Sequence, residues 1–180
     1  AGNNKGINLA KTRYVLISNP DVIYENDFFS NLKTYIDRNT DFSIIGPIYR
    51  SEDYASHGFF EDLKKENFNN DTAENQNLIK THWIVGCTMF IDLNKFDNKN
   101  LFDENFFLFF EEFDLCRRVL NKGGKIFVSK NLYVKHLGHK GSVAVDPKYE
   151  KESVFLRSWH WMWSSFYYYE KNFSYFYALK

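Results

Sequence analysis

Residues 14–46 read YVLISNPDVIYENDFFSNLKTYIDRNTDFSIIG. The continuous apolar runs at the two ends of this stretch, residues 14–18 and 42–46, favour short buried strands. Between them, apolar residues recur at three- and four-residue spacing after Asn26 or Asp27, either of which can cap a helix. A strand, a crossover helix and a second strand are the repeating unit of a parallel α/β sheet.

The rest of the chain continues this pattern. Residues 83–92 predict a strand with Gly86 in its middle, where a missing side chain lets another backbone or a ligand come close. The polar residues 50–80 predict a long loop between the strands. The expected fold is therefore α/β with a mostly parallel central sheet. We also expect a helix at 111–120, which the glycines 123 and 124 end. Strands are expected at 125–129 and 132–136.

Composition limits the classes of function. The 180 residues carry 23 basic and 23 acidic side chains, so the formal net charge is zero. A general nucleic-acid binder shows an excess of Lys and Arg, so we expect no nucleic-acid partner. A mean hydropathy of −0.49 excludes a multi-span membrane protein. Cys87 and Cys116 are too few for a disulfide scaffold and are interpreted as small buried residues.

Aromatic residues make up 19% of the chain, and twelve of them lie between residues 150 and 177. We expect a partial catalytic domain at residues 1–145 and an aromatic helical tail at residues 146–180. The favoured interpretation is that the tail packs on the domain. The alternative is peripheral membrane contact through residues 150–180, with Trp and Tyr at the lipid headgroups.

Polar residues follow two of the expected strands. Asn19, Pro20 and Asp21 come directly after the first strand, where an open α/β sheet binds its ligands. A carboxylate there can hold a divalent cation that bridges substrate phosphates, although Asn-Pro-Asp is also an ordinary turn sequence. His136 ends a later strand and can ligate a metal or serve as a hydrogen-bonding residue.

Carboxylates follow the apolar run FFLFF at residues 106–110. Glu111, Glu112 and Asp114 start the expected helix, where the helix dipole favours acidic residues for structural reasons alone. A carboxylate at the edge of an apolar wall can instead have a raised pKa and act as a general base. A Gly/Asn loop at the start of the chain could present amides to a phosphate or sugar through Gly2, Asn3, Asn4 and Gly6.

These features occur in an order that resembles the family 2 glycosyltransferases, in particular their rhamnosyltransferase-like branch. The order is the Gly/Asn loop, Asn-Pro-Asp, Trp83-x-x-Gly86, FDENFFLFFEEFDLCRR at residues 102–118, and HLGHKGS at residues 136–142. The resemblance implies a GT-A-like nucleotide-diphospho-sugar transferase sandwich. It also implies that the family's first strand and its base-reading acidic residue would precede Ala1, so the chain is expected to be truncated at its N-terminus.

The resemblance also implies residue roles. Asp21 and His136 would bind Mn²⁺ or Mg²⁺ and the donor diphosphate, with Asn19 contacting the sugar. Glu112 would be the catalytic base, with Glu111 and Asp114 as alternatives. The N-terminal loop residues named above would bind donor, and Trp83 with Gly86 would line the acceptor pocket.

The expected function is metal-dependent transfer of a sugar, such as rhamnose, with inversion. The donor would be a nucleotide diphosphate sugar, and the acceptor a hydroxyl of a glycan or lipid-linked glycan in cell-surface polysaccharide biosynthesis. The expected location is the cytoplasm, at the inner face of the cytoplasmic membrane. Two alternatives are a non-catalytic remnant that binds carbohydrate or a partner, and a metal-dependent phosphoesterase.

Overall fold

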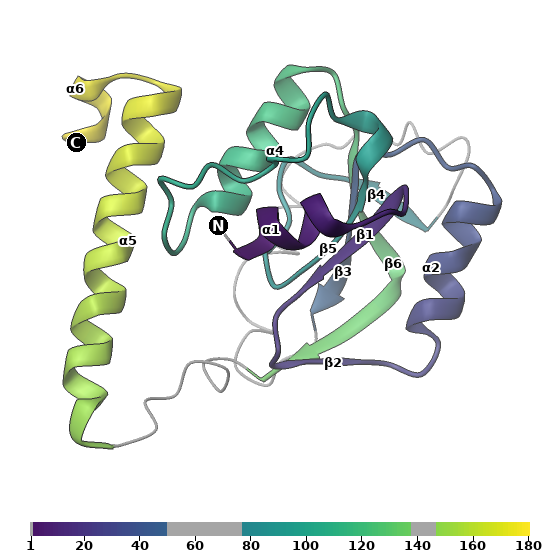
Figure 1. Cartoon of the computed structure of the whole chain (residues 1–180), viewed down its shortest axis with the longest axis horizontal. Helices are drawn as coiled ribbons and strands as arrows, with labels where there is room; N and C mark the ends of the chain where they lie inside the picture. Colours follow the sequence, from purple (N-terminus) through teal and green to yellow (C-terminus); the bar gives the residue numbers. More distant parts are fainter. Residues whose placement is uncertain (1, 50–76, 138–146) are drawn as a thin grey trace.

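Six strands form one sheet in the computed structural model, which describes residues 2–49, 77–137 and 147–180 (Figure 1). The sheet order is β1-β5-β3-β6-β2, and β4 also pairs with β6. The strands are β1 (Tyr14–Ser18), β2 (Val22–Tyr24), β3 (Ile44–Tyr49), β4 (Leu78–Lys80), β5 (Thr88–Asp92) and β6 (Ile126–His136).

The sheet is mixed, so the expected mostly parallel central sheet of a GT-A-like sandwich is wrong. Only β3 and β6 pair in parallel, whereas the other four pairings are antiparallel. The two strands at the ends of residues 14–46 do run in the same direction, but β5 lies between them and is antiparallel to both. An apolar run marks a buried strand without fixing its direction, which explains the error.

Two of the expected strands have different limits. The run at residues 83–92 forms a strand only from Thr88, so Gly86 lies in the turn before it. The two short strands expected at 125–129 and 132–136 are one continuous strand, β6. Most of the polar stretch at 50–80 lies outside the described residues, and only β4 is seen at its end.

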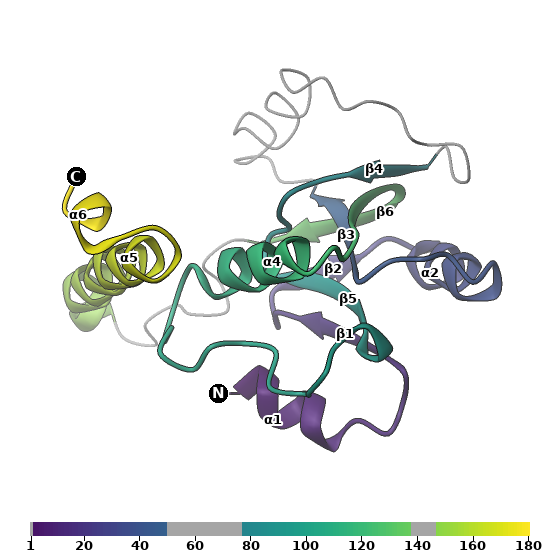
Figure 2. The same cartoon turned by 90° about the horizontal axis from the view of Figure 1, so that it is seen from above.

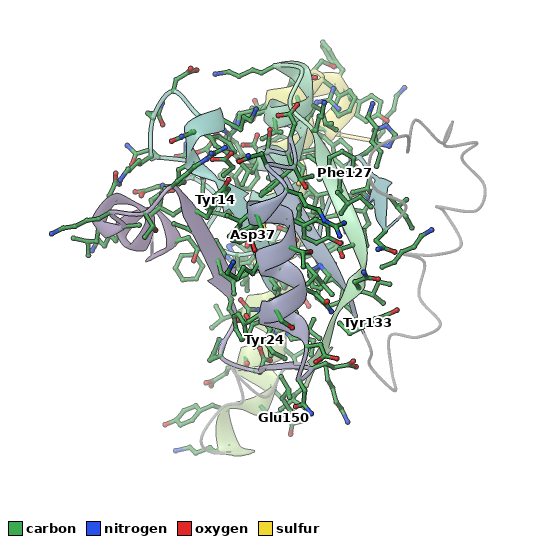
Figure 3. The ribbon with its side chains drawn as sticks, turned by 90° about the vertical axis from the view of Figure 1, so that its right-hand side faces the viewer. Tyr14, Tyr24, Asp37, Phe127, Tyr133 and Glu150 are labelled. Carbon is green, nitrogen blue, oxygen red and sulfur yellow. The ribbon has the colours of Figure 1, made fainter. Side chains whose placement is uncertain are left out.

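Helices cover both faces of the sheet (Figures 1 and 2). Neighbouring residues of β3, Ile44 and Ile45, belong to different core clusters because side chains alternate along a strand. Ile44 packs in the cluster that contains α1 and α4 residues, and Ile45 packs with α2 residues. Figure 3 shows α2 lying over the strands beside β6. The helices of these two layers are α1 (Gly2–Leu9), α2 (Phe28–Asp37) and α4 (Glu111–Asn121).

The aromatic tail is helical, as its pattern predicts. It forms α5 (Glu150–Asn172), preceded by the short turn η3 (Pro147–Tyr149), and α6 (Tyr175–Ala178). Figure 1 places α5 at the opposite end of the molecule from α2, next to α4 and the segment that leads into it. The division into a domain at 1–145 and a tail at 146–180 stays a prediction. No helix in the described ranges is long and apolar enough to cross a membrane.

Candidate functional site

Asp21 and His136 lie together at one edge of the sheet. Asp21 Oδ1 is 3.2 Å from His136 Nε2, and both side chains are largely shielded from solvent. The pairing of β2 with β6 causes this contact, because Val22 lies opposite His136 in the register. The Leu137 N–H also donates to the Asp21 carbonyl at 2.9 Å. Two residues that the sequence offers separately as metal ligands are therefore brought together.

The Asp21–His136 pair can contribute two protein ligands to a divalent cation. Within residues 2–49, 77–137 and 147–180 no group of three or more His, Cys, Asp or Glu side chains could hold a metal ion. A magnesium-type site that bridges substrate phosphates commonly uses one or two carboxylates, with phosphate oxygens and waters completing the coordination. Asp21 supplies one such carboxylate, with the imidazole of His136 beside it. The rest of the His136 motif, residues 138–142, lies outside the described residues.

The segment at Gly86 and Cys87 connects this edge to the start of α4. The Asn19 N–H donates to the Cys87 carbonyl at 2.9 Å. On the other side, a Cβ atom at Gly86 would lie 3.3 Å from the Glu112 Cβ. The sequence predicts a close approach at this glycine, and the neighbour that approaches is Glu112.

The carboxylates of Asp21 and Glu112 both affect the pKa of the Cys87 thiol. Burial, with smaller contributions from the charges of Asp21 and Glu112, raises the pKa of its thiol to about 12. The thiol is therefore neutral, and both carboxylates lie near enough to act on it electrostatically.

Tyr49, at the end of β3, contacts the backbone around Gly86 and Cys87. Its hydroxyl donates to the Val85 carbonyl at 3.1 Å and to the Thr88 carbonyl at 3.2 Å. Burial raises its pKa well above the usual value of 10.0. Tyr49 therefore holds the backbone on both sides of Gly86 and Cys87. Tyr49 cannot be recognised in the sequence, because Tyr at the end of an apolar run is an ordinary strand residue.

Glu111 and Glu112 form a buried carboxyl pair at the first turn of α4. The Oε2 atoms of both are buried and have no hydrogen-bond partner in the described part of the chain. Burial, together with the neighbouring charge of Glu111, raises the pKa of Glu112 to about 8. Burial raises the pKa of Glu111 as well. The helix dipole acts in the opposite direction, so desolvation dominates here and favours the interpretation as a base.

Asp114 has a different environment from the Glu pair. Its side chain is fully buried, and its carboxylate lies 2.7 Å from Arg118 Nε and 2.7 Å from Lys171 Nζ. Lys171, from α5, also lies 2.7 Å from the Asp103 carboxylate. Asp114 therefore belongs to an ion-pair network with Arg118 and Lys171, and this network explains its position as a structural one.

The backbone before the Glu pair is strained. Phe109 and Phe110 have φ values of 68° and 65°, in the left-handed region that bulky residues rarely adopt. Such a conformation costs about 1–3 kcal/mol per residue and persists only where the surrounding contacts impose it. The ring of Trp161 lies 5.3 Å from that of Phe109 and 5.1 Å from that of Phe110, and the Ser164 hydroxyl donates to the Leu108 carbonyl at 2.7 Å. Helix α5 thus holds the turn that carries Glu111 and Glu112.

The N-terminal stretch is not the expected loop. Gly2, Asn3, Asn4 and Gly6 all belong to helix α1. The Asn4 amide donates to the Phe102 carbonyl at 2.8 Å and accepts from the Phe102 N–H at 2.9 Å. Asn4 therefore attaches α1 to the segment that precedes α4. A donor-binding role for these four residues stays a prediction.

Trp83 packs beside the start of α4. Its ring stacks on that of Phe113 with a centroid separation of 4.6 Å. Because Phe113 follows Glu112 directly, this aromatic pair lies close in the chain to the proposed base. Its role in acceptor binding stays a prediction.

Comparisons with known proteins give no family for the chain. No family model matches it, and no match was found among curated proteins.

Proposed function

We propose that the chain carries the catalytic centre of an inverting sugar transferase. The donor would be a nucleotide diphosphate sugar, and the acceptor a hydroxyl of a glycan or lipid-linked glycan. One observation carries the proposal: a buried carboxyl pair with a raised pKa, Glu111–Glu112, is connected through Gly86 and Cys87 to the Asp21–His136 pair. Such an arrangement supplies a proton acceptor next to a site for an anionic leaving group.

Glu112 is the proposed general base. A buried carboxyl oxygen without a hydrogen-bond partner is unusual and can be satisfied by a substrate hydroxyl. Positioned proton transfer of this kind contributes about 10²–10⁴-fold to a rate. A carboxylate with a raised pKa is also a stronger base once ionised.

The Asp21–His136 pair is the proposed site for the donor diphosphate. These two residues would hold Mn²⁺ or Mg²⁺, which when bound neutralises negative charge that builds up on the diphosphate. Without substrate, Asp21 and the imidazole of His136 hold each other in place at the start of β2 and the end of β6. Asn19, whose backbone is fixed by Cys87, is the proposed contact to the sugar.

The proposed reaction is one in-line displacement. The acceptor oxygen forms a bond to the anomeric carbon while its proton passes to Glu112. The bond from that carbon to the diphosphate oxygen breaks, and its electron pair leaves with the nucleoside diphosphate. Attack from the face opposite the leaving group inverts the anomeric centre. A role in surface polysaccharide assembly at the inner face of the cytoplasmic membrane is part of the same proposal.

Substitution of the base tests this function. We expect Glu112→Gln to lower the release of nucleoside diphosphate, measured over panels of UDP-, dTDP- and GDP-sugars and lipid-linked or free glycans, by at least about 100-fold. Donor affinity, measured by titration calorimetry, should not change. Asp97→Asn is the matched control, because Asp97 is an exposed carboxylate. Equal turnover by Glu112→Gln and wild type, or donor binding without any turnover by wild type, would contradict the proposal.

A further inference from the structure

The two carboxyl groups at the start of α4 lie against each other. Glu111 and Glu112 are consecutive residues, and their side chains are within hydrogen-bonding distance of one another. Two ionised carboxylates cannot form such a hydrogen bond, because neither has a proton to donate. The contact therefore requires one proton between the two groups.

The surroundings of this pair favour a single negative charge. The Oε2 atoms of Glu111 and Glu112 are buried and have no hydrogen-bond partner among the described residues. The backbone at Gly86 covers the pair from the other side, where a Cβ atom would lie 3.4 Å from the Glu112 Cδ. Two adjacent charges are costly in a desolvated place, and one shared proton removes one of them.

Three other titratable groups lie where the charge of Glu112 acts on them, and all three stay neutral near pH 7. They are Cys87 before β5, Cys116 in α4 and Tyr49 at the end of β3. Burial raises the pKa of both thiols to about 12 and that of the Tyr49 hydroxyl well above its usual value of 10.0. A neutral thiol or phenol does not take up a proton, so these groups cannot serve as its acceptor.

Glu111 can take a proton that Glu112 gives up. Because the pKa of Glu112 is about 8, this residue keeps its proton at neutral pH, whereas a general base must be able to accept one. The carboxylate of Glu111 lies beside it. Asp114 cannot take this role, because it is ion-paired to Arg118 and Lys171.

From this arrangement we infer that Glu111 and Glu112 hold one proton between them and accept the proton of the substrate as a pair. The inference rests on the proposed sugar transfer for the source of that second proton. One oxygen of Glu112 takes the proton of the acceptor hydroxyl while its other oxygen passes the shared proton to Glu111. The electron pair of the broken O–H bond forms the bond to the anomeric carbon, and the nucleoside diphosphate leaves with the electron pair of its own bond. The carboxyl pair ends with two protons and no charge.

Infrared spectroscopy of the chain without substrate tests the shared proton. Protonated and ionised carboxyl groups absorb at different frequencies, so the spectrum near neutral pH reports groups that keep their proton there. Asp41, Asp97 and Asp103 all have a lowered pKa and do not contribute. We expect wild type to show the band of a protonated carboxyl group at pH 7 and to lose it as the pH rises through about 8.

Substitution of Glu111 distinguishes a shared proton from a lone buried carboxyl group. Glu111→Gln removes the neighbouring charge and supplies an N–H donor, so the midpoint at which the band is lost should fall by at least about one pH unit. Glu111→Asp keeps a carboxyl group and should bring the midpoint back toward the wild-type value. Glu170→Gln is the control, because Glu170 is exposed on α5, and it should match wild type. Circular dichroism checks that each variant keeps its fold.

The pH dependence of transfer tests the role of Glu111 in the reaction. If the pair accepts the proton, kcat/KM should not rise between pH 7 and pH 8, whereas a lone Glu112 base would make it rise as the pH passes through about 8. Such a rise would overturn the inference. So would a wild type without the protonated band at pH 7, an equal midpoint in Glu111→Gln and wild type, or a band that Mn²⁺ alone removes, since a cation would then take the place of the proton. No transfer by a wild type that shows the band would contradict the proposed function and leave the shared proton standing.

Discussion

Glu112 links the stability of the protein to the chemistry of its site. Its carboxyl is desolvated and lies beside a second carboxyl, so its pKa in the folded chain is about 8 against an ordinary 4.5. Between these pH values the folded state binds the proton more tightly than the unfolded state. This contribution to stability is therefore complete below about pH 4.5 and is lost as the pH rises through 8.

A pH series of unfolding measurements tests this linkage. From pH 6 to pH 9 we expect the free energy of unfolding of wild type to fall by at least about 1.4 kcal/mol more than that of Glu112→Gln, which is the value of one pKa unit. Glutamine carries no charge at any of these pH values, so the variant does not lose stability through desolvation of a carboxylate. Urea denaturation at each pH supplies the data.

Glu170→Gln is the control for this series, because Glu170 is exposed on α5. It should follow wild type at every pH. Parallel curves for wild type and Glu112→Gln would mean that Glu112 titrates as an ordinary carboxyl.

At the scale of elements, α5 sets the geometry at the start of α4. Trp161 contacts both strained residues, Phe109 and Phe110, directly before the Glu pair. We expect Trp161→Ala to destabilise the protein by about 1–2 kcal/mol, from the loss of two aromatic contacts. The relaxed turn should also admit water to Glu112 and move the midpoint of its pH dependence toward 4.5.

Trp159→Ala is a close control for this effect. Trp159 and Trp161 are both 52% exposed on the same helix, but the ring contacts to Phe109 and Phe110 come from Trp161. Trp159→Ala should leave the pH midpoint unchanged. A midpoint that moves equally in both variants, or in neither, would show that Trp161 has no positioning role.

The same elements show what the sequence could predict. The apolar periodicity gave α2, α4 and the tail helices, because a helix that buries one face must repeat its apolar residues every three or four positions. Strand direction and neighbours could not be predicted, since the runs around Ile45 and Phe90 look alike whichever way they pair. The left-handed turn at Phe109 and Phe110 could not be foreseen either, because it depends on contacts with α5 about 50 residues later.

At the scale of the whole molecule, the sheet brings distant candidates to one edge. Asp21 and His136 meet because β2 pairs with β6, and Gly86 leaves room for Glu112. Each of these residues was recognisable in the sequence by its residue type and its place after an apolar run. The ion-pair network of Asp114 could not be recognised in the sequence. Its partner Lys171 lies in the tail, and only the fold brings the two side chains together.

The most direct test of the proposed transferase is its donor binding at this edge. Titration calorimetry with nucleotide diphosphate sugars should show binding that strengthens with Mn²⁺. Asp21→Asn should weaken that binding at least about tenfold, because it removes the carboxylate beside His136. Glu112→Gln should bind donor as wild type does. Donor binding that is unaffected by Asp21→Asn, or no binding of any nucleotide diphosphate sugar by wild type, would contradict the proposal.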